Sequence, residues 1–313
     1  QDIVRLRESK KKWNLNAEWE KFLTKETHFI TRYDALFPSR LLHLEIVPFA
    51  LYYKGELPPE DSFQVAIVGA RMCTNYGKTI AGEIGKFCAH QKVGVISGLA
   101  RGIDTAAQGG ALKAGGNSYG ILGGGVNVIY PPENKRIYQE VSKSGALISQ
   151  YPPDYVPRAQ CFTYRNRIIS GLADAVIIVE ARERSGSLIT ADFALAQGKD
   201  VYAVPGRIDD PLSIGCNQLI HQGAQIVTTI DSLFEDMKIF NGKFYEKSVK
   251  NKIQLDKEEL LVYSCLGLHP LPFSQIFEET KLPIGMLVKT LTELMNNGFV
   301  VEYYKNYYCR SEI

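Results

Sequence analysis

Residues 162–206 read FTYRNRIISGLADAVIIVEARERSGSLITADFALAQGKDVYAVPG. Two short apolar runs, Ala175–Val179 and Val201–Val204, alternate with helical stretches at Arg165–Leu172 and Leu188–Gln197. Short runs rich in Val and Ile are typical of strands that are buried on both faces, as in parallel sheets. The stretch therefore predicts alternating helices and parallel strands.

The same alternation extends over residues 63–237. Further strands are expected at Gln64–Val68, Val93–Ile96, Ser118–Leu122, Ala146–Ser149 and Gln225–Val227. Further helices are expected at Gly77–His90, Asp104–Ala114, Asn134–Lys143, Cys216–Gln222 and Ile230–Met237. Alternation over this length predicts a doubly wound α/β domain.

The segment before this domain, residues 1–62, predicts helices and a connector. Leu15, Trp19 and Phe22 repeat at helical spacing, and a second short helix is expected near Arg32–Phe37. Leu41–Leu57 is expected to run extended, because prolines and a glycine interrupt it.

After the α/β domain, residues 238–252 predict a polar, basic linker. Residues 253–313 predict three helices, marked by Leu260–Leu266, Phe273–Phe277 and Ile284–Met295, with Gly298 as the stop of the third. A hairpin turning at residues 305–306 is expected to follow. Three helices and a hairpin make a winged helix-turn-helix.

The composition is that of a soluble globular protein. The chain has 313 residues, of which 45% are hydrophobic and 22% charged, and its length suggests about two domains. No apolar run reaches the roughly 18 residues of a membrane span, and no signal peptide is expected. The six cysteines are scattered without zinc-ligand spacing, so we expect reduced thiols in a cytoplasmic protein.

Net charge differs between segments. Residues 1–62 are neutral, with 10 basic and 10 acidic side chains, and residues 63–237 carry +1, with 16 and 15. The linker carries +4, with 5 and 1, and residues 253–313 carry −3, with 5 and 8. An anion site must therefore be a local concentration of charge.

Glycine and serine follow most of the expected strands. The residues expected to offer backbone N–H groups to phosphate are Gly69, Gly98, Gly124, Gly125, Ser185, Gly186 and Ser187. Ligands of open α/β sheets bind at the carboxyl ends of the strands, where glycine allows close approach and helix N-termini supply free donors. The alternative is a set of tight turns without a ligand.

Cations follow the same strand ends. They are Arg71, Arg101, Lys135, Arg136, Arg165 and Arg167. Each alone could be a solvated surface charge, but together they predict a phosphate-binding rim, because the guanidinium fork matches phosphate oxygens.

Groups for catalysis are scarce on this rim. Asp104 and Asp192 fit helix caps or dipole partners, and neither a Walker motif nor GxGxxG is present. Five aromatic residues lie near the rim motifs: Tyr76, Tyr130, Tyr138, Phe162 and Tyr164. We expect two of the five to be exposed. Cations with interleaved aromatic rings favour a binder of single-stranded nucleic acid over an enzyme.

The motifs resemble those of the DprA/Smf family of recombination mediators, over about residues 30–237. Besides residues 162–206, they are VAIVGARMCTNYG (65–77), VISGLARGIDTAAQGGAL (95–112), GILGGGVNVIYPPENKRIY (120–138) and IGCNQLIHQGA (214–224). The resemblance implies an extended Rossmann-like fold with an N-terminal helical SAM-like segment and a C-terminal winged helix. It also implies that the protein protects incoming single-stranded DNA and loads a RecA-type recombinase onto it in natural transformation. The protein is expected to act as a homodimer. No catalysis, cofactor, metal or membrane association is expected.

The resemblance assigns DNA-binding roles to individual positions: Arg71, Arg101, Lys135, Tyr138, Arg165 and Arg167. This chain departs from the family pattern at Ala70, Asn127 and Gln150, where Ser, Asp and Glu are usual. The last two departures remove negative charge near the expected anion site.

Two other functions fit parts of the sequence. The fold also resembles the lonely-guy nucleotide phosphoribohydrolases, in which Asp192 would stand in for the catalytic Glu. A transcription factor built on the winged helix is the third interpretation. We expect that unit to add little to DNA affinity. We expect the homodimer to form through residues 218–237, whose apolar residues are Leu219, Ile220, Ile226, Leu233 and Phe234.

Overall fold

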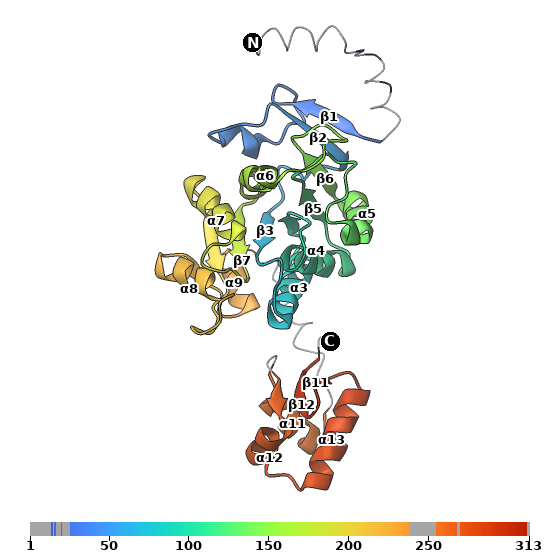
Figure 1. The fold of residues 1–313 in the computed structure, drawn as a ribbon, viewed down its shortest axis with the longest axis vertical. Helices are drawn as coiled ribbons and strands as arrows, with labels where there is room; N and C mark the ends of the chain where they lie inside the picture. Colours follow the sequence, from blue (N-terminus) through green and yellow to red (C-terminus); the bar gives the residue numbers. More distant parts are fainter. Residues whose placement is uncertain are drawn as a thin grey trace. The chain divides into compact units, whose positions relative to one another are not determined.

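The computed structural model describes residues 14, 16, 20, 26–237, 239, 255–267 and 270–311. The chain divides into two compact units, residues 1–240 and 241–313 (Figure 1). The first unit contains the α/β domain and the segment before it, and the second contains the expected C-terminal helices and hairpin. Among the described residues, no helix combines the length and apolar character that a membrane crossing requires.

A nine-stranded sheet forms the centre of the first unit, in the order β1-β2-β6-β5-β4-β3-β7-β8-β9. The strands are β1 (His28–Thr31), β2 (Ala50–Gly55), β3 (Gln64–Val68), β4 (Gly94–Ser97), β5 (Ser118–Ile121), β6 (Ala146–Ser149), β7 (Ala175–Ile178), β8 (Asp200–Ala203) and β9 (Gln225–Ile226). Strands β3 to β9 pair in parallel, whereas β2 is antiparallel to β6 and to β1. The predicted Rossmann-like parallel sheet is confirmed, with an antiparallel extension at one edge.

Helices cover both faces of this sheet, as a doubly wound fold requires. On one face lie α3 (Asn75–His90), α4 (Ile103–Lys113), α5 (Lys135–Ser144) and α9 (Ile230–Asp236); on the other lie α6 (Ala159–Leu172), α7 (Gly186–Ala196) and α8 (Ile214–His221). Successive residues of β3 show the division, because Val65 and Ile67 pack with α3 and α4 whereas Ala66 and Val68 pack with α6 and α7.

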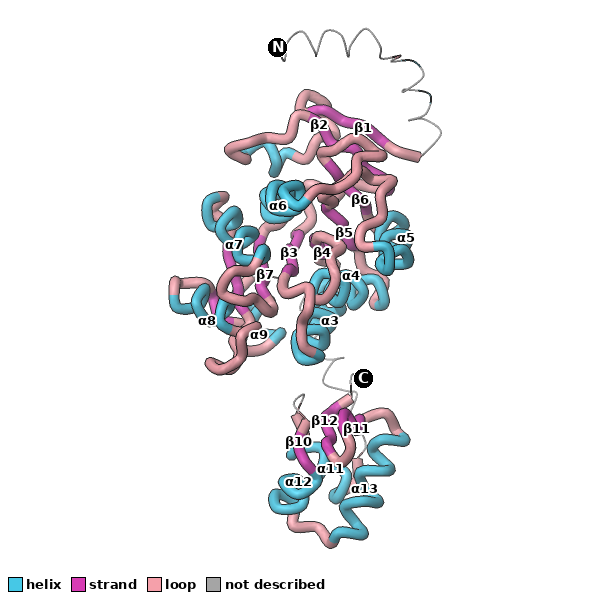
Figure 2. Tube along the Cα trace, in the orientation of Figure 1, coloured by secondary structure: helices cyan, strands magenta, loops and turns pink. Residues whose placement is uncertain are grey.

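Glycine sets the close approach of α3 and α4, which run side by side in Figure 2. A Cβ on Gly85 would lie 2.1 Å from the carbonyl oxygen of Ala107, and one on Gly110 would lie 2.1 Å from that of Gly82. Such contacts do not occur between real atoms, so a side chain at either position would push the helices apart. The start of α4 is held against the loop after β3, because the N–H of Ile103 donates to the carbonyl oxygen of Ala70 at 3.2 Å.

The segment before β3 differs from the expected helical one. Residues 32–37 form turns, η1 (Ser39–His43) is a 3-10 helix, and the expected helix near Arg32–Phe37 is therefore wrong. The backbone N–H and hydroxyl of Thr31 both donate to a carboxylate oxygen of Asp34, at 2.7 and 2.8 Å, which favours a turn over a helix. The other expected helix, around residues 15–23, lies largely outside the described residues.

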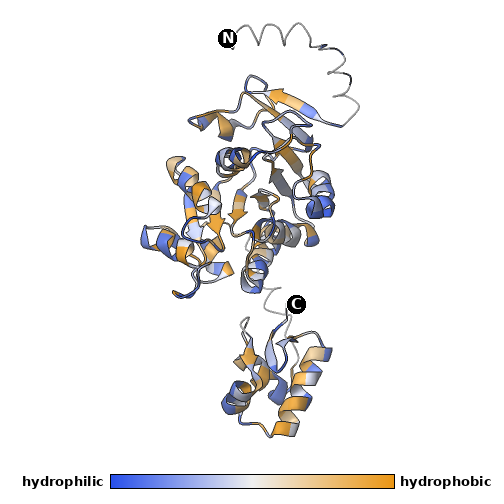
Figure 3. Ribbon diagram, viewed as in Figure 1, coloured by the Kyte–Doolittle hydropathy of each residue, from blue (hydrophilic) through white to orange (hydrophobic). Residues whose placement is uncertain are grey.

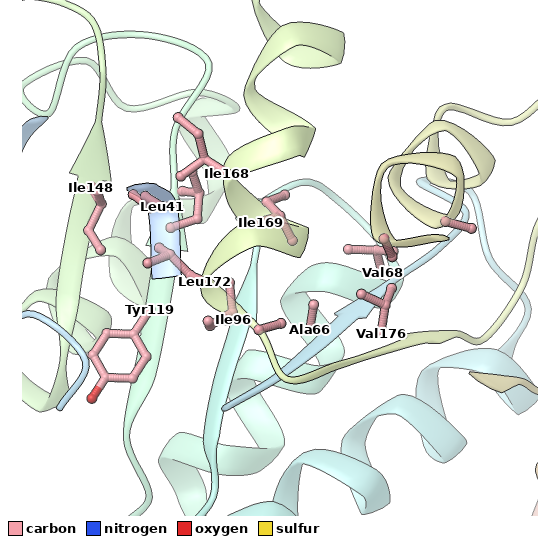
Figure 4. Packing of buried hydrophobic residues seen from close by; sticks show 14 of the residues in the cluster. Leu41, Ala66, Val68, Ile96, Tyr119, Ile148, Ile168, Ile169, Leu172 and Val176 are labelled. Carbon is pink, nitrogen blue, oxygen red and sulfur yellow. The ribbon is translucent and has the colours of Figure 1, made fainter. Parts of the chain in front are cut away.

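The described part of this N-terminal segment is built into the core of the first unit. Figure 4 shows Leu41 of η1 among Ile148, Ile168 and Leu172, which come from β6 and α6. A Cβ on Gly171 would lie 2.9 Å from the Leu44 side chain. Residues 26–62 therefore pack against α6 as part of the sheet's hydrophobic core.

The second unit has the arrangement of a winged helix. Its elements are α11 (Lys257–Cys265), β10 (Leu271–Pro272), α12 (Phe273–Thr280), α13 (Ile284–Asn296), β11 (Val300–Tyr304) and β12 (Tyr307–Arg310). Val262, Ile276 and Leu287 form its core, one from each helix. Gly298 follows α13 at φ +76°, as expected for a helix stop. The predicted linker, residues 238–252, lies outside the described residues apart from Ile239.

Candidate nucleic-acid interface

A cleft of about 540 Å³ opens where strand order reverses, between β3 and β7. The chain continues from β3 to β4 on one side and from β7 to β8 on the other, so the loops after β3 and β7 diverge there. This is the position at which open α/β sheets bind ligands. The loop Gly69–Met72 forms one wall of the cleft, residues 182–187 form another, and Phe162 and Asn166 of α6 contribute a third.

Four arginines line this cleft. Arg71, Arg182 and Arg184 are exposed, whereas Arg165 is buried below them. The sequence analysis missed Arg182 and Arg184, although both lie in the stretch EARERSGS at the carboxyl end of β7. The three exposed guanidinium groups concentrate positive charge in a domain whose net charge is +1.

The N-terminus of α7 opens into the same cleft. The Ser185 side chain caps this helix by accepting from the Ser187 backbone N–H, and the two serine hydroxyl groups lie 2.7 Å apart. Apart from its chain neighbours and the backbone of its own helix, no heavy atom of the described residues lies within 4 Å of the point where a Cβ of Gly186 would stand. The N–H groups of Ser187 and Leu188 already donate to Ser185, so the helix dipole and the nearby Arg182 and Arg184 are what suit an anion such as phosphate here.

Phe162 divides the cleft from a smaller hollow, and cations surround its ring. The guanidinium carbon of Arg71 lies 5.3 Å from the ring centroid, and that of Arg165 lies 6.0 Å from it. The Tyr130 ring lies 5.3 Å away at 38°. Arg71, Phe162 and Arg165 line both spaces, and Arg101 lines the smaller one. The Phe162 ring therefore lies between the cleft and a hollow of about 10 Å³ beside Arg101, which has room for about one water molecule.

Arg101 is held by a carboxylate in this structure. Its Nε donates to Glu133, at the start of the 3-10 helix η2 (Pro132–Asn134), and both side chains are about half exposed. This hydrogen bond lowers the pKa of Glu133 and raises the pKa of Arg101. An anion approaching Arg101 must compete with Glu133.

Arg165 has a structural role that the sequence did not predict. Its side chain is buried and donates to the carbonyl oxygens of Gly98 and Ile121. Burial lowers the pKa of Arg165, and the charge of Asp104 opposes that change. Arg165 therefore lines the cleft as a buried charge that holds its floor, and a direct contact between Arg165 and DNA stays a prediction.

Asp104 is the buried acid beside Arg165. Its carboxylate accepts from the backbone N–H groups of Gly98 and Ala100, at 3.0 and 3.4 Å. Burial raises the pKa of Asp104, while Arg165 and these two hydrogen bonds lower it. Asp104 therefore fixes the loop after β4, and the N–H of Gly98 is already used within the protein. That corrects the prediction of Gly98 as a phosphate donor.

Arg167 and Tyr138 are also corrected, because both are buried at 4% exposure. Arg167 donates to the carbonyl oxygens of Ile46 and Tyr164 and to Gln150 Oε1, at 2.7 to 3.1 Å. The Tyr138 ring packs in the core beneath α5, and its hydroxyl donates to the carbonyl oxygen of Tyr130 at 2.8 Å. Neither side chain reaches the surface of the cleft.

The glycine turn after β5 is covered by protein. The N–H of Gly125 donates to the carbonyl oxygen of Tyr155 at 2.8 Å. A Cβ on Gly125 would lie 2.1 Å from the carbonyl oxygen of Pro152, and one on Gly124 would lie 2.9 Å from Pro157. The loop at residues 152–157 therefore occupies the space that the sequence analysis assigned to phosphate. Gly69, Ser185, Gly186 and Ser187 do line the cleft.

Lys135 and Arg136 are exposed at the start of α5 and are not among the residues that line the cleft or the smaller hollow. Arg136 pairs with Glu140 on the same helix at 2.7 Å. A contact between these two residues and DNA stays a prediction. Of the five rim aromatics, Tyr130 and Tyr164 are exposed, at 44% and 41%, which confirms the expected number. Over the described ranges, no group of three His, Cys, Asp or Glu side chains could hold a metal ion.

Comparison with known proteins identifies the family. Residues 28–238 match the family model described as DNA recombination-mediator protein A. The chain is 37% identical to protein Smf of Escherichia coli over 282 residues, which cover 87% of this chain and 75% of that protein.

Two solved structures are similar to this chain. The X-ray structure of DNA processing protein A from Streptococcus pneumoniae has a TM-score of 0.64 and 37% identity, and the match covers 69% of this chain and 77% of that one. The Helicobacter pylori protein of the same name was described for its single-stranded DNA binding mode. It has a TM-score of 0.61 and 29% identity, over 67% of this chain and 96% of that one. The chain with the arginine-lined cleft thus belongs to the family of DNA recombination-mediator protein A.

Proposed function

We propose that this protein binds single-stranded DNA in the cleft between β3 and β7. The observation that carries the proposal is the convergence of Arg71, Arg182 and Arg184 with the N-terminus of α7. These groups offer charge and hydrogen bonds to phosphate oxygens, and Phe162 and Tyr130 offer ring faces to bases. The Helicobacter pylori relative, described as binding single-stranded DNA, supports the same substrate.

Fluorescence anisotropy with a labelled oligo-dT and a duplex of the same length tests this proposal. We expect tighter binding of the single strand, without strong sequence preference, because splayed bases can stack on the rings whereas paired bases cannot. Affinity is expected to fall as salt rises, since phosphate contacts release counterions. Equal affinity for the two forms would contradict the proposal.

We further propose that the bound strand is protected and passed to a RecA-type recombinase during natural transformation in the cytoplasm. Membership in a recombination-mediator family supports this role. The test is the lag before a recombinase hydrolyses ATP on DNA coated with a single-strand-binding protein. We expect this protein to shorten the lag, and an unchanged lag would contradict the role.

The proposed homodimer needs a revised surface. Of the five apolar residues that suggested a surface at residues 218–237, Leu219, Leu233 and Phe234 are buried in the protein's own core and Ile220 packs against it. The edge strand β9 in that range remains available for pairing, and its Ile226 is 45% exposed. Light scattering at micromolar concentration is expected to give a dimer mass, which Ile226→Lys should reduce to that of a monomer.

We propose that the cleft acts without catalysis. The acidic residue in its lining, Asp104, is buried and engaged by two backbone N–H groups. Asp192, which a phosphoribohydrolase of the lonely-guy type would need, lines a different hollow between α7 and α8. Incubation with nucleoside monophosphates is therefore expected to release no free base, and release of base would favour the enzyme.

A further inference from the structure

A pair of exposed aromatic rings lies in the N-terminal segment, outside the cleft. Tyr33 follows β1 and Phe49 precedes β2, and their side chains are 75% and 61% exposed. Large aromatic side chains stabilise a protein when they are buried, so two such rings in solvent are a candidate binding surface. We call these two residues and Arg32 the Arg32 platform.

A cation joins the two rings. The guanidinium carbon of Arg32 lies 5.2 Å from the Tyr33 ring centroid and 5.7 Å from that of Phe49. The rings themselves lie 6.2 Å apart at 78°. Arg32 is exposed and also donates to the Tyr33 hydroxyl at 3.0 Å. The platform thus combines a positive charge with ring surface that solvent can reach.

The backbone beneath the platform is fixed. The Arg32 N–H donates to the carbonyl oxygen of Phe49 at 3.0 Å, which ties the two strands together next to the rings. Asp34, the nearest acid in sequence, accepts from Thr31 twice, and these hydrogen bonds lower its pKa. The rings are therefore presented by a braced turn, and the carboxylate of Asp34 is engaged by its neighbour.

A chain of contacts connects this platform to α6, which also lines the cleft. The carbonyl oxygen of Ile46 accepts from Arg167 Nε at 3.1 Å, and the Arg167 guanidinium carbon lies 4.0 Å from the centroid of the exposed Tyr164 ring. Two residues, Val47 and Pro48, separate Ile46 from Phe49, so their Cα atoms lie at most about 11 Å apart. Phe49 therefore lies a few nucleotide lengths from Tyr164. Tyr164 belongs to α6, the helix that places Phe162 in the cleft.

We propose that the Arg32 platform is a second, base-stacking subsite for single-stranded DNA that extends from the cleft along α6. The inference rests on the proposed function of the cleft. Stacked bases would cover the rings of Tyr33 and Phe49, and Arg32 would contact a neighbouring phosphate. A purely apolar partner would leave the Arg32 charge desolvated and unpaired, whereas a polynucleotide satisfies ring and cation together.

Two oligonucleotides of different length distinguish DNA binding at this subsite from DNA binding in the cleft. An oligo-dT of about six nucleotides can occupy the cleft alone, whereas one of about 25 can reach both sites. We expect Tyr33→Ala combined with Phe49→Ala to weaken the long oligonucleotide at least tenfold and the short one less than twofold. Leu36→Ala is the matched control, because Leu36 is 71% exposed in the same segment and carries no ring.

A 2-aminopurine base placed at successive positions of the long oligonucleotide gives a second readout. We expect its fluorescence to be quenched at positions beyond the cleft in the parent protein and restored in the double variant. If the parent protein binds both oligonucleotides and the double variant binds the long one equally well, the subsite is wrong and the cleft stands. If the parent protein binds neither, the proposed function itself fails and the subsite with it.

Discussion

The cleft and the winged-helix unit differ in what they present at the surface. In the cleft, three exposed arginines surround a helix N-terminus. In the winged-helix unit, α13 is the helix that would enter a DNA groove, and it exposes Ile284, Met286 and Val288. Figure 3 colours most of this helix as hydrophobic. Its cation, Lys289, lies 3.8 Å from Glu293 on the same helix.

The hairpin of that unit adds to the difference. Tyr303, Tyr304 and Tyr307 are 40%, 66% and 44% exposed, and residues 253–313 carry a net charge of −3. A fold that reads DNA in other proteins here carries an apolar and acidic surface, which repels a phosphate backbone. The comparison supports the proposal that the cleft is the DNA-binding site, because the placement of charge differs between the two units and a fold alone does not fix function.

The largest effect is expected on the free energy of unfolding, which should fall when a buried arginine is replaced but not when an exposed one is. Arg165→Ala leaves two carbonyl oxygens without a donor and Asp104 without a neighbouring positive charge. We expect a loss of about 2–4 kcal/mol in the free energy of unfolding, measured by urea denaturation. Arg71→Ala is the control and is expected to cost less than about 0.5 kcal/mol, because Arg71 is exposed. Equal losses of stability in the two variants would contradict the distinction between a structural Arg165 and an exposed Arg71.

The second largest effect is expected on DNA affinity, when exposed charge is removed from the cleft and not from the winged-helix unit. Arg71→Ala combined with Arg184→Ala deletes two candidate phosphate contacts, each charge-assisted and worth about 1.5–3 kcal/mol before desolvation. We expect single-stranded DNA to bind roughly thirtyfold more weakly with little change in stability. Lys289→Ala in the winged-helix unit is the control. A variant that retains full affinity would show that the cleft is not the site.

Releasing Arg101 is expected to strengthen binding. Glu133→Gln removes the carboxylate that competes for the Arg101 guanidinium beside Phe162. We expect single-strand affinity to rise about two- to fivefold, since an exposed ion pair is worth about 0.2–1 kcal/mol. Glu140→Gln is the matched control, because it frees Arg136, which does not line the cleft. A rise of the same size in both variants would point to net charge alone.

The smallest effect is expected from losing the second unit. Deleting residues 253–313 while keeping the basic linker should change single-strand affinity less than threefold, because that unit is acidic and its exposed helix is apolar. Anisotropy titrations of the full chain and the shortened chain measure the change. A tenfold loss, or duplex binding by residues 253–313 alone, would contradict the comparison.

Strands β3 to β7 of the α/β domain were predictable because every residue in them is buried, on both faces of the sheet. The run at Gln64–Val68 and that at Ala146–Ser149 match β3 and β6 at both ends. Residues 31–34 were not predictable from helical periodicity, since hydrogen bonds from Thr31 to the Asp34 side chain favour a turn.

The site was predictable in part. Arg71 and the start of α7 followed from their places at strand ends, and the same reasoning could have found Arg182 and Arg184. Burial of Arg165 and Arg167 could not be read from sequence, because α6 begins at Ala159. Arg165 therefore lies six residues into the helix, whereas the sequence predicted it as the first residue. Likewise, nothing in GGG shows that the loop at residues 152–157 covers it.

The salt dependence of single-strand binding tests the central claim most directly. Each phosphate contact on a single strand contributes about 0.7 to the slope of log K against log salt. The slope is expected to become shallower by about 1.4 when Arg71 and Arg184 are both replaced by alanine, and to stay unchanged when Lys289 and Lys305 are replaced. A slope that responds to Lys289 and Lys305 but not to the cleft arginines would place the DNA on the winged-helix unit and contradict the account.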